Sequence, residues 1–580
     1  MQDLMPRLEP LLGQVNQPSR YLGGELNQIL KPEAAYRVAF MYPDTYEIGA
    51  ANLAVAILYD VLNQVADVAC ERVYLPWLDM QEAMRAAGIP LFSLESHAPV
   101  GDFDLFCITL PHELAATNIL RALDLAGIPL CAADRGEADP LVFGGGPVSN
   151  NPAPLSAFFD GFSIGEGEEA LPELAALLRD LKAKGVSRAE QLQAAAALPG
   201  FYVPGVSNPQ VVVRKRIDSD WRERVRVLRP IVPYPETMAD RVSVEIMRGC
   251  VRGCRFCQAG ATNMPLRLRS VETIEQAVYQ ELAATGFDEV SLTSLSSTDH
   301  PQIVELLRRL NRQLGPVGVK VSLPSQRMDA FGVDAATAAA AGAKKGSLTF
   351  APEAATQRLR DLINKGISRS QIESALLHAV ELGWRKFKLY FMFGLPGERE
   401  SDVVAIAGLC DELYQLLREA LPPAERGALS ISASVGLFVP KPHTPFQWCG
   451  QLPLPEARKR LTALRAAAHK LPRAVRVHWH DLEPSQIEAV LARGDAQVSQ
   501  LILAAHRHGA SFDAWSEQFD YGIWQKAAAD CGLDLEALAS HELSQDAALP
   551  WQMIGSGARP GFLQHQYQKF LTELEVGRDQ

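Results

Sequence analysis

The sequence predicts an α/β protein, and three observations carry this prediction. Short apolar runs alternate with helical stretches over residues 34–180, and the same alternation resumes over residues 235–448. Amphipathic helical patterns then dominate residues 449–580. Strands that alternate with helices usually pair in parallel. We therefore expect an N-terminal doubly wound (flavodoxin- or Rossmann-like) parallel sheet, a central partial (β/α)6 TIM-type barrel and a helical C-terminal region.

The N-terminal alternation follows an extension over residues 1–33. Its apolar runs include "YRVAFMYP" (36–43), "FDLFCITL" (103–110) and "PLVFGGGP" (140–147), and helical patterns lie between them. Ligands of a doubly wound sheet bind at the carboxyl ends of its strands. The segments "YPDTYEIGA", "TLPHE" and "GGGP" fall at those ends, so we expect a binding site there.

Residues 181–234 have mixed Pro, Gly and charged composition, and we interpret them as a connector. The second alternation contains six strand candidates, at 242–247, 289–297, 319–325, 345–353, 386–398 and 429–440. Six βα units in one stretch predict a barrel or part of one, with its chemistry at the carboxyl ends of the strands. We expect "FVPKPHTPF" (438–446) to close the last unit.

The bulk composition is that of an ordinary globular protein, with 580 residues, 47% hydrophobic and 21% charged. The net charge of -12 provides no overall attraction to nucleic acid or anionic membranes, so a nucleic-acid substrate is not favoured. The N-terminus lacks the pattern of a signal peptide, and no run of 18 apolar residues predicts a membrane helix. We expect a cytoplasmic protein with reduced thiols and no membrane partner.

Three of the nine cysteines lie within "RGCVRGCRFCQAG" (248–260). Cys250, Cys254 and Cys257 have the spacing C-x3-C-x2-C, directly after the first barrel strand. Reduced thiols argue against disulfides, and a structural zinc site needs a fourth ligand that no nearby residue offers. Three thiolates suit a cubane iron–sulfur cluster with one iron left open, because ordinary electron-transfer clusters take four. Zinc and coincidence remain the alternatives.

The segment "CVRGCRFC" resembles the cluster motif of the radical S-adenosylmethionine (radical SAM) superfamily, C-x3-C-x-aromatic-C, with Phe256 at the aromatic position. The resemblance implies a 4Fe-4S cluster held by the three cysteines and S-adenosylmethionine (SAM) on the fourth iron. It implies an enzyme that reductively cleaves SAM to a 5'-deoxyadenosyl radical, which then abstracts hydrogen. The expected partners are an unknown substrate and an electron donor such as flavodoxin or ferredoxin.

The resemblance also implies where SAM binds on the barrel. The expected SAM-binding residues are Phe256, Thr293, Ser294, Ser296, Arg327, Glu353, Gly394, Pro396 and Gly397. Each has a structural alternative. Ser and Thr at strand ends often cap the next helix. Glu353 could pair with Arg358 or Arg360, and the 394–397 segment could be a simple turn.

Most of the chain is similar to a little-characterised bacterial radical SAM family with an N-terminal cobalamin-binding-like domain. The similarity lies in segments such as "YPDTYEIGAANLAVAILY", "LVFGGGPVSNNPAPL" and "FFDGFSIGEGEEALPELAALL". It implies cobalamin as a third cofactor, with the expected contacts Tyr46, Gly49, Gly144, Gly145, Gly146, Gly165, Glu166 and Gly167. The cobalt-binding pattern D-x-H-x-x-G is absent, because Tyr46 stands where its His would be.

These inferences favour cobalamin-assisted methylation or rearrangement at an unactivated carbon. One alternative is a sulfur-inserting or RNA-modifying enzyme that resembles methylthiotransferases, which carry a second cluster; Cys70, Cys107 and Cys131 are its only N-terminal thiols. A second alternative is a non-enzymatic cobalamin or redox sensor. The pair His478 and His480 offers only two metal ligands, which favours a polar strand edge or a substrate-facing loop. The sequence indicates neither the substrate nor the catalytic residues.

Overall fold

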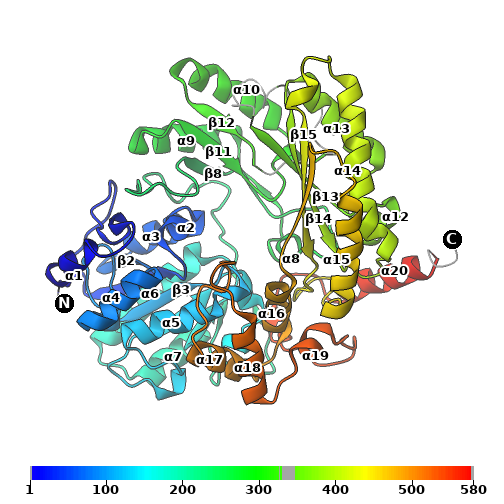
Figure 1. The fold of residues 1–580 in the computed structure, drawn as a ribbon. Coiled ribbons are helices and arrows are strands. Elements are labelled where there is room, and N and C mark those ends of the chain that lie inside the picture. Colours follow the sequence, from blue (N-terminus) through cyan, green and yellow to red (C-terminus); the bar gives the residue numbers. More distant parts are fainter. Residues whose placement is uncertain (1–2, 325–326, 329–336, 338–345, 577–580) are drawn as a thin grey trace.

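The computed structural model describes residues 3–324, 327–328, 337 and 346–576. Figure 1 shows an N-terminal α/β part in blue and cyan beside a green and yellow part in which strands lie inside and helices lie outside. The orange C-terminal helices return to the N-terminal part, and the last helix lies against the yellow part. The α/β prediction is therefore confirmed.

The N-terminal sheet has the order β2-β1-β3-β4-β5-β6, and its first five strands are parallel. Its strands are β1 (Tyr36–Tyr42), β2 (Val68–Tyr74), β3 (Leu105–Thr109), β4 (Leu141–Gly145), β5 (Gly161–Ser163) and the antiparallel β6 (Phe201–Tyr202). Apolar side chains alternate between its two faces, because successive side chains of a strand point to opposite sides. The sheet is thus covered on both faces, as a doubly wound fold requires.

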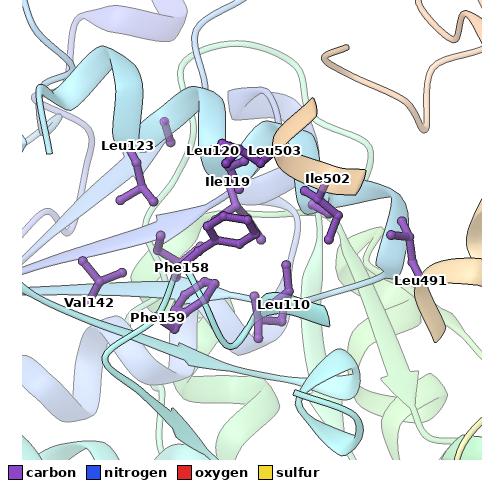
Figure 2. Close-up of a cluster of buried hydrophobic side chains, with 14 of the residues drawn as sticks. Leu110, Ile119, Leu120, Leu123, Val142, Phe158, Phe159, Leu491, Ile502 and Leu503 are labelled. Atoms are coloured by element: carbon purple, nitrogen blue, oxygen red, sulfur yellow. The ribbon is translucent and has the colours of Figure 1, made fainter. Parts of the chain in front are cut away.

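Helices α3 (Leu53–Asn63) and α6 (Gly167–Ala183) cover one face, where they pack on Val38, Phe40 and Phe143. Residues of α5 (Ala116–Ala126), α16 (Leu482–Arg493), α17 (Val498–Arg507) and α18 (Tyr521–Cys531) form the core of the other face. Figure 2 shows part of that core, which contains Leu491, Ile502 and Leu503 of the C-terminal helices together with Phe158 and Phe159. The C-terminal helices are therefore integral to the N-terminal core.

Among its described residues, the second part contains seven parallel strands in two sheets. One sheet has the order β12-β11-β8 and the other the order β13-β14-β15-β16. The strands are β8 (Val242–Glu245), β11 (Glu289–Thr293), β12 (Lys320–Ser322), β13 (Ser347–Glu353), β14 (Lys386–Phe393), β15 (Ser430–Leu437) and β16 (Val475–Trp479). All six predicted strand regions contain a strand, and β16 is a seventh that the sequence analysis assigned to the helical region.

Helices cover the outer faces of these two sheets. They are α9 (Val271–Thr285), α10 (Ile303–Leu314), α13 (Arg369–Glu381), α14 (Glu400–Ala420) and α15 (Leu454–Ala468). In α10, buried Ile303, Leu306, Leu307, Leu310 and Leu314 recur at helical spacing and form one apolar stripe. Along β14, buried residues alternate with exposed or half-buried ones, so one face packs on helices while the other faces the interior.

Two expectations about the C-terminal region need correction. "FVPKPHTPF" (438–446) does not close the last unit, because β16 follows it and pairs with β15. The region also contains β17 (Ile554–Gly555), which pairs with β7 (Val213–Arg214) of the predicted connector. His480 lies just after β16, and its Nε2 lies 3.1 Å from the Ser434 hydroxyl, which agrees with the polar-edge interpretation of the histidine pair.

The remaining elements are short or lie at the ends of the chain. They are α1 (Met5–Leu12), α2 (Tyr46–Ala50), α4 (Leu78–Ala87), α7 (Arg188–Ala197), β9 (Met247–Arg248), α8 (Gln258–Thr262), β10 (Arg267–Leu268), α12 (Gln357–Leu362), α19 (Leu535–Ser540) and α20 (Phe562–Val576). Among the helices that the structure describes, none combines the length and apolar character needed to cross a bilayer.

Candidate functional site

The three cysteines lie in the loop between β9 and α8, which we call the cluster loop (residues 249–257). Gly249 and Gly253 have φ angles of +92° and +67°, a conformation that favours glycine. The Asn364 side chain donates to the Gly253 carbonyl (2.7 Å), and the Arg255 amide donates to the Ile363 carbonyl (3.0 Å). The loop is therefore held by the segment that follows α12.

All three cysteines are free, half-buried and line one cavity of about 280 Å³. The Cys257 thiol also accepts a hydrogen bond from the Gly260 amide at the start of α8 (3.3 Å). Burial raises the pKa of the Cys254 and Cys257 thiols, and the nearby Lys365 charge opposes this rise at both. Binding to iron would remove the thiol protons, because iron–sulfur clusters are held by thiolates.

We call this space the cluster cavity. Its lining comes from the cluster loop and from the carboxyl ends of the strands around it. The lining residues are Cys250, Arg252, Gly253, Cys254, Phe256, Cys257, Gly260, Leu295, Ser296, Pro324, Arg327, Met328, Thr349, Phe350, Ala351, Glu353, Lys365 and Ile367. Four predicted SAM-binding residues are thus brought beside the cysteines, namely Phe256, Ser296, Arg327 and Glu353.

Two ion pairs involve charged side chains that line the cluster cavity. Glu353, at the end of β13 with a φ of +67°, accepts from the Lys365 ammonium group (3.0 Å). It does not pair with Arg358 or Arg360, which bind other groups. Arg252 pairs with Asp299 (2.9 Å), and Asp299 also accepts from the Ser296 hydroxyl (2.7 Å). These pairs place both signs of charge beside the thiols.

The other predicted SAM-binding residues do not line this cavity. The Ser294 hydroxyl contacts the Ser297 hydroxyl (2.9 Å) and accepts from the Ser296 amide (3.1 Å), as a turn-forming serine does. A β-carbon on Gly394 would approach Leu437, and one on Gly397 would approach Leu574. Thr293 and Pro396 are likewise absent from the cavity lining. SAM contacts by these five residues remain predictions.

Lys365, Arg252 and Asp299 are site residues that the sequence analysis missed. Lys365 belongs to the turn after α12, and Asp299 follows the predicted serine-rich strand end. Their ion pairs join residues 12 and 47 positions apart. Arg252 and Asp299 follow strands β9 and β11 closely, where the carboxyl-end rule applies, whereas helix α12 separates Lys365 from β13.

The cysteines form the only thiol-rich loop in the part of the chain that the structure describes. Within that part, no three or more His, Cys, Asp or Glu side chains converge on one ion position. Each thiolate of a cubane binds its own iron, so a cluster does not require convergence on one point. Cys70 and Cys107 are buried in the N-terminal sheet on β2 and β3.

A second, larger cavity of about 460 Å³ lies at the carboxyl end of the N-terminal sheet. We call it the sheet cavity. Its lining comes from β1, β3, β4, the loops after β4 and β5, helix α3 and the end of β8. It includes Phe40, Tyr42, Asn52, Leu53, Leu58, Thr109, Leu110, Phe143, Gly144, Gly145, Gly146, Ser163, Gly165, Glu166, Gly167, Glu168, Glu245 and Arg248. Six predicted cobalamin contacts are among them.

Glycine is sterically required along the floor of the sheet cavity. A β-carbon on Gly146, which has a φ of +131°, would lie 2.8 Å from the Leu110 carbonyl oxygen. A β-carbon on Gly144 would lie 2.9 Å from the Leu110 side chain and 3.0 Å from Phe159. Gly145 has only ordinary contacts, the nearest at 3.5 Å. Close packing on Leu110 therefore requires glycine at 144 and 146, whereas Gly145 has free space at its β-carbon position.

The other two predicted cobalamin contacts, Tyr46 and Gly49, do not line the sheet cavity. Tyr46 is 2% exposed, and its hydroxyl donates to Glu25 (2.7 Å). Its ring packs edge-on against Tyr74, and a β-carbon on Gly49 would clash with that same Tyr74 ring. Both residues pack against Tyr74 at the end of β2, whereas the sheet cavity lies on the β3 and β4 side of β1.

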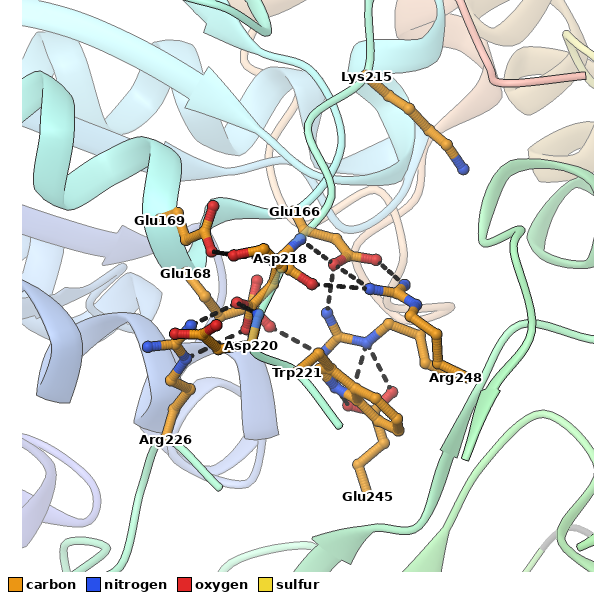
Figure 3. A network of polar contacts seen from close by, with 12 residues as sticks. Glu166, Glu168, Glu169, Lys215, Asp218, Asp220, Trp221, Arg226, Glu245 and Arg248 are labelled. Atoms are coloured by element: carbon orange, nitrogen blue, oxygen red, sulfur yellow. Dashed lines mark hydrogen bonds and ion pairs between the residues drawn. The ribbon is translucent and has the colours of Figure 1, made fainter. Parts of the chain in front are cut away.

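Arg248 lines the sheet cavity, and Figure 3 shows the network of charged residues around it. Arg248, two residues before Cys250, forms ion pairs with Glu168 (2.7 Å), Glu245 (2.7 Å) and Glu166 (3.1 Å). Arg267 of the paired strand β10 also binds Glu166. The guanidinium groups of Arg248, Arg267 and Arg269 lie 4.2 to 5.5 Å from the ring centre of buried Trp221. We call this set the Arg248 network.

Comparisons with known proteins identify two stretches of the chain. Residues 54–204 match the family described as "Radical SAM proteins, N-terminal", and residues 244–410 match the "Radical SAM superfamily". Uncharacterized protein MJ0966 of Methanocaldococcus jannaschii is 27% identical over 503 residues, which are 84% of this chain and 98% of the relative.

Solved structures with similar folds include two cobalamin-dependent radical SAM proteins. The methyltransferase TsrM from Kitasatospora setae, with cobalamin and a [4Fe-4S] cluster bound, is 15% identical, with a TM-score of 0.49, over 94% of this chain and 99% of that one. The enzyme OxsB, with aqua-cobalamin and S-adenosylmethionine bound, is 11% identical, with a TM-score of 0.47, over 94% and 80%.

The two family matches lie in chain order and together span more than half of the sequence. The second match contains all three cysteines of the cluster loop and four of the strands that surround the cluster cavity beyond β8. The chain therefore belongs to the radical SAM superfamily and is a radical SAM enzyme.

Proposed function

We propose that this enzyme holds a 4Fe-4S cluster on Cys250, Cys254 and Cys257, binds SAM beside it in the cluster cavity and binds cobalamin in the sheet cavity. Its reaction is the methylation or rearrangement of an unactivated carbon. The observation that carries the proposal is the opening of three free thiols into one cavity that also contains paired carboxylate and cationic groups.

The cluster loop fits a three-cysteine cluster. Its thiols are free, its glycines permit the tight backbone path, and half-burial limits access of water. When bound, the cluster would supply the electron that cleaves SAM. Such an electron has to come from a reductant, for which a flavodoxin or ferredoxin is the expected type of partner.

Around the cluster, the chain offers groups suited to an amino acid and a ribose. The Glu353 carboxylate can accept hydrogen bonds from ribose hydroxyls or from an ammonium group. Arg327 and Lys365 can donate to a carboxylate, and the Ser296 hydroxyl can do either. Phe256 adds an apolar wall next to the cysteines. Together they would orient SAM and exclude water from its reactive bond.

The sheet cavity fits a large, flat ligand with a polar rim. Its walls are apolar at Phe40, Leu58 and Phe143, and Gly145 adds no side chain to its lining. None of the described residues that line it is a histidine, so cobalamin would bind there without a histidine ligand to cobalt. When bound, cobalamin would supply methyl-transfer or radical chemistry, with its tail in the glycine-rich part of the cavity.

Anaerobic purification after expression with hydroxocobalamin tests both cofactors. We expect one visible spectrum that contains a cluster absorption and the bands of cobalamin. Addition of dithionite and SAM should yield 5'-deoxyadenosine or a methylated or rearranged product. Iron-loaded protein that neither binds nor consumes SAM would refute the radical function, and loaded protein free of cobalamin would refute the cobalamin part alone. About eight irons per chain would instead favour the sulfur-inserting alternative.

A further inference from the structure

The C-terminal helix α20 packs against the cluster loop from more than 300 positions away in the sequence. Its Phe570 is 2% exposed and belongs to a core cluster with Leu362, Ile363 and Phe446, against which Phe256 of the cluster loop also packs. The rings of Phe446 and Phe570 lie 4.9 Å apart and nearly edge to face. Burial of these aromatic groups fixes α20 to the loop.

One ion pair crosses this contact. Arg255 lies between Cys254 and Cys257, is 1% exposed and does not line the cluster cavity. Its Nη1 donates to Oε2 of Glu573 (2.5 Å) and to the Leu362 carbonyl (2.7 Å), and its guanidinium carbon lies 6.0 Å from the Phe570 ring centre. Glu573 is the carboxylate that neutralises this buried cation. Its other contact is a distant one to Lys569 (3.8 Å).

The placement of Arg255 has an electrostatic consequence. A buried charge interacts strongly with its surroundings, because protein screens it far less than water does. Hydrogen bonds, net charge and solvent exposure around an iron–sulfur cluster set its reduction potential. An uncompensated cation within the cluster loop would favour the reduced cluster, which carries one more electron.

We propose that Glu573 is a positioning residue that acts through Arg255, so that helix α20 holds the cluster loop and sets the reduction potential of the cluster. The inference rests on the proposed function, because it requires a cluster on the three cysteines. In this account the C-terminal helix contributes charge as well as packing.

The account predicts shifts of opposite sign for the two partners. Glu573→Gln keeps the shape and hydrogen-bonding capacity of the side chain but leaves the Arg255 charge uncompensated, so the midpoint potential should become more positive. Arg255→Met removes the buried cation and leaves Glu573, which is 37% exposed, to be screened by water. The midpoint potential should then become more negative. If the two substitutions only loosened the packing of α20, there would be no reason for the midpoint potential to shift in opposite directions in the two variants.

The control is Glu575→Gln, which makes the same charge change on an exposed position of the same helix. It should leave the potential at the wild-type value. Thermal unfolding and iron content of each variant, measured alongside, would show whether the helix stays folded and the cluster loaded. Because Arg255 is buried, Arg255→Met could fail to accumulate; Glu573→Gln, whose site is half-buried, then decides the question.

The experiment is an anaerobic titration of the full-length, cluster-loaded protein with dithionite, followed by electron paramagnetic resonance. Each cluster takes one electron from dithionite and passes from the 2+ to the 1+ state. A positive shift for Glu573→Gln relative to both wild type and Glu575→Gln supports the proposal. No shift, or a negative one, overturns it. Wild-type protein that binds no cluster would instead refute the proposed function. Failure of the proposed function can therefore be distinguished from failure of the proposal about Glu573.

Discussion

The cluster cavity and the sheet cavity differ in what identifies them. Both lie at the carboxyl ends of parallel strands, and both use glycine where the backbone must turn or leave space. The cluster cavity contains three thiols and two ion pairs, groups with few chemical uses in such an arrangement. The sheet cavity is defined mainly by shape, with apolar walls and a glycine floor that many ligands could share.

This difference explains why a short motif identifies one cavity and not the other. Thiolates bind metal through specific bonds, so their spacing carries chemical information. Apolar walls and glycines act through shape, which depends on residues distant in sequence. Variants that abolish binding in one cavity and leave binding in the other unchanged test whether the two cavities act independently. A substitution in the Arg248 network tests how much the contacts between them contribute to stability.

The largest effect is expected from loss of a cluster ligand. Cys254→Ser should abolish cluster binding and 5'-deoxyadenosine formation, because a hydroxyl is a poor substitute for a thiolate ligand. Iron content and product analysis measure this. Cobalamin bound in the sheet cavity should be unaffected. Cys531→Ser, at a free cysteine outside both cavities, is the control. A Cys254→Ser protein that kept its iron and its activity would contradict the assignment of the loop.

The reverse separation is expected from filling the sheet cavity. Gly145 lines the cavity, and its β-carbon position has only ordinary contacts, so Gly145→Leu would place a side chain into the space without a backbone clash. We expect loss of the cobalamin bands with an unchanged cluster absorption. Gly408→Leu, on the exposed face of α14, is the matched control. Cobalamin retained by Gly145→Leu would place its site elsewhere.

Within the cluster cavity, Glu353→Gln should weaken SAM binding. The substitution removes the carboxylate charge at the end of β13 and leaves Lys365 without its partner. A hydrogen bond to a charged group contributes about 1.5–3 kcal/mol, which corresponds to a Kd increase of roughly 10- to 100-fold. Calorimetry on the cluster-loaded protein measures the Kd for SAM. Glu373→Gln on α13 makes the same charge change outside the cluster cavity and is the control. An unchanged Kd would remove Glu353 from the SAM site.

The connection between the cavities should matter for stability. Arg248→Met leaves Glu168, which is largely buried, without its cation and should lower the free energy of unfolding by about 3 kcal/mol, as expected for a broken buried ion pair. Arg458→Met breaks an exposed pair with Glu483 and should cost about 1 kcal/mol or less. Urea unfolding compares the two. Equal costs would mean that the Arg248 network is energetically no different from a surface pair.

The smallest effect concerns a carboxyl outside both cavities. Glu281 on α9 is 2% exposed, its Oε1 has no hydrogen-bond partner among the described residues, and burial raises its pKa from 4.5 to about 8 despite the Arg269 charge. The folded state therefore holds this proton more tightly than the unfolded state, and the resulting stability is lost as the pH rises from about 4.5 through 8.

Replacement of the Glu281 carboxyl by an amide removes the contribution of this group to the pH dependence of the free energy of unfolding. Glu281→Gln should match wild type in stability at pH 4.5 and exceed it above pH 8, with a difference that grows as the pH rises between these values. Urea unfolding of both proteins at pH 5 and pH 8.5 gives the comparison. A difference that did not grow with pH would show that Glu281 does not titrate in this range.

The strands of the fold were predictable because their patterns are local. Residues 36–42, 386–393 and 430–437 are apolar or alternating runs between turn residues, and each is a strand in the structure. The last barrel strand, residues 475–479, was missed because it is short, polar on one face and flanked by helices. Its place became clear only through its pairing with β15.

The same distinction holds for the sites. The cysteine spacing and the glycine run are contiguous in sequence, and the structure places each of them in a cavity. Tyr46 does not line the sheet cavity, and its contact with cobalamin stays a prediction, because a sequence motif does not show which side of β1 its helix will cover. Arg248, Lys365 and Glu573 were missed since their partners are set by tertiary packing, up to 318 positions away for Glu573.

The most direct test of the central claim is whether SAM binds the cluster itself. Electron paramagnetic resonance of the dithionite-reduced, cluster-loaded protein should change its g-values when SAM is added, because SAM would coordinate the iron that no cysteine holds. The same change should be absent with S-adenosylmethionine replaced by adenosine. A signal that stays the same at saturating SAM would show a cluster without an open iron and would contradict the account.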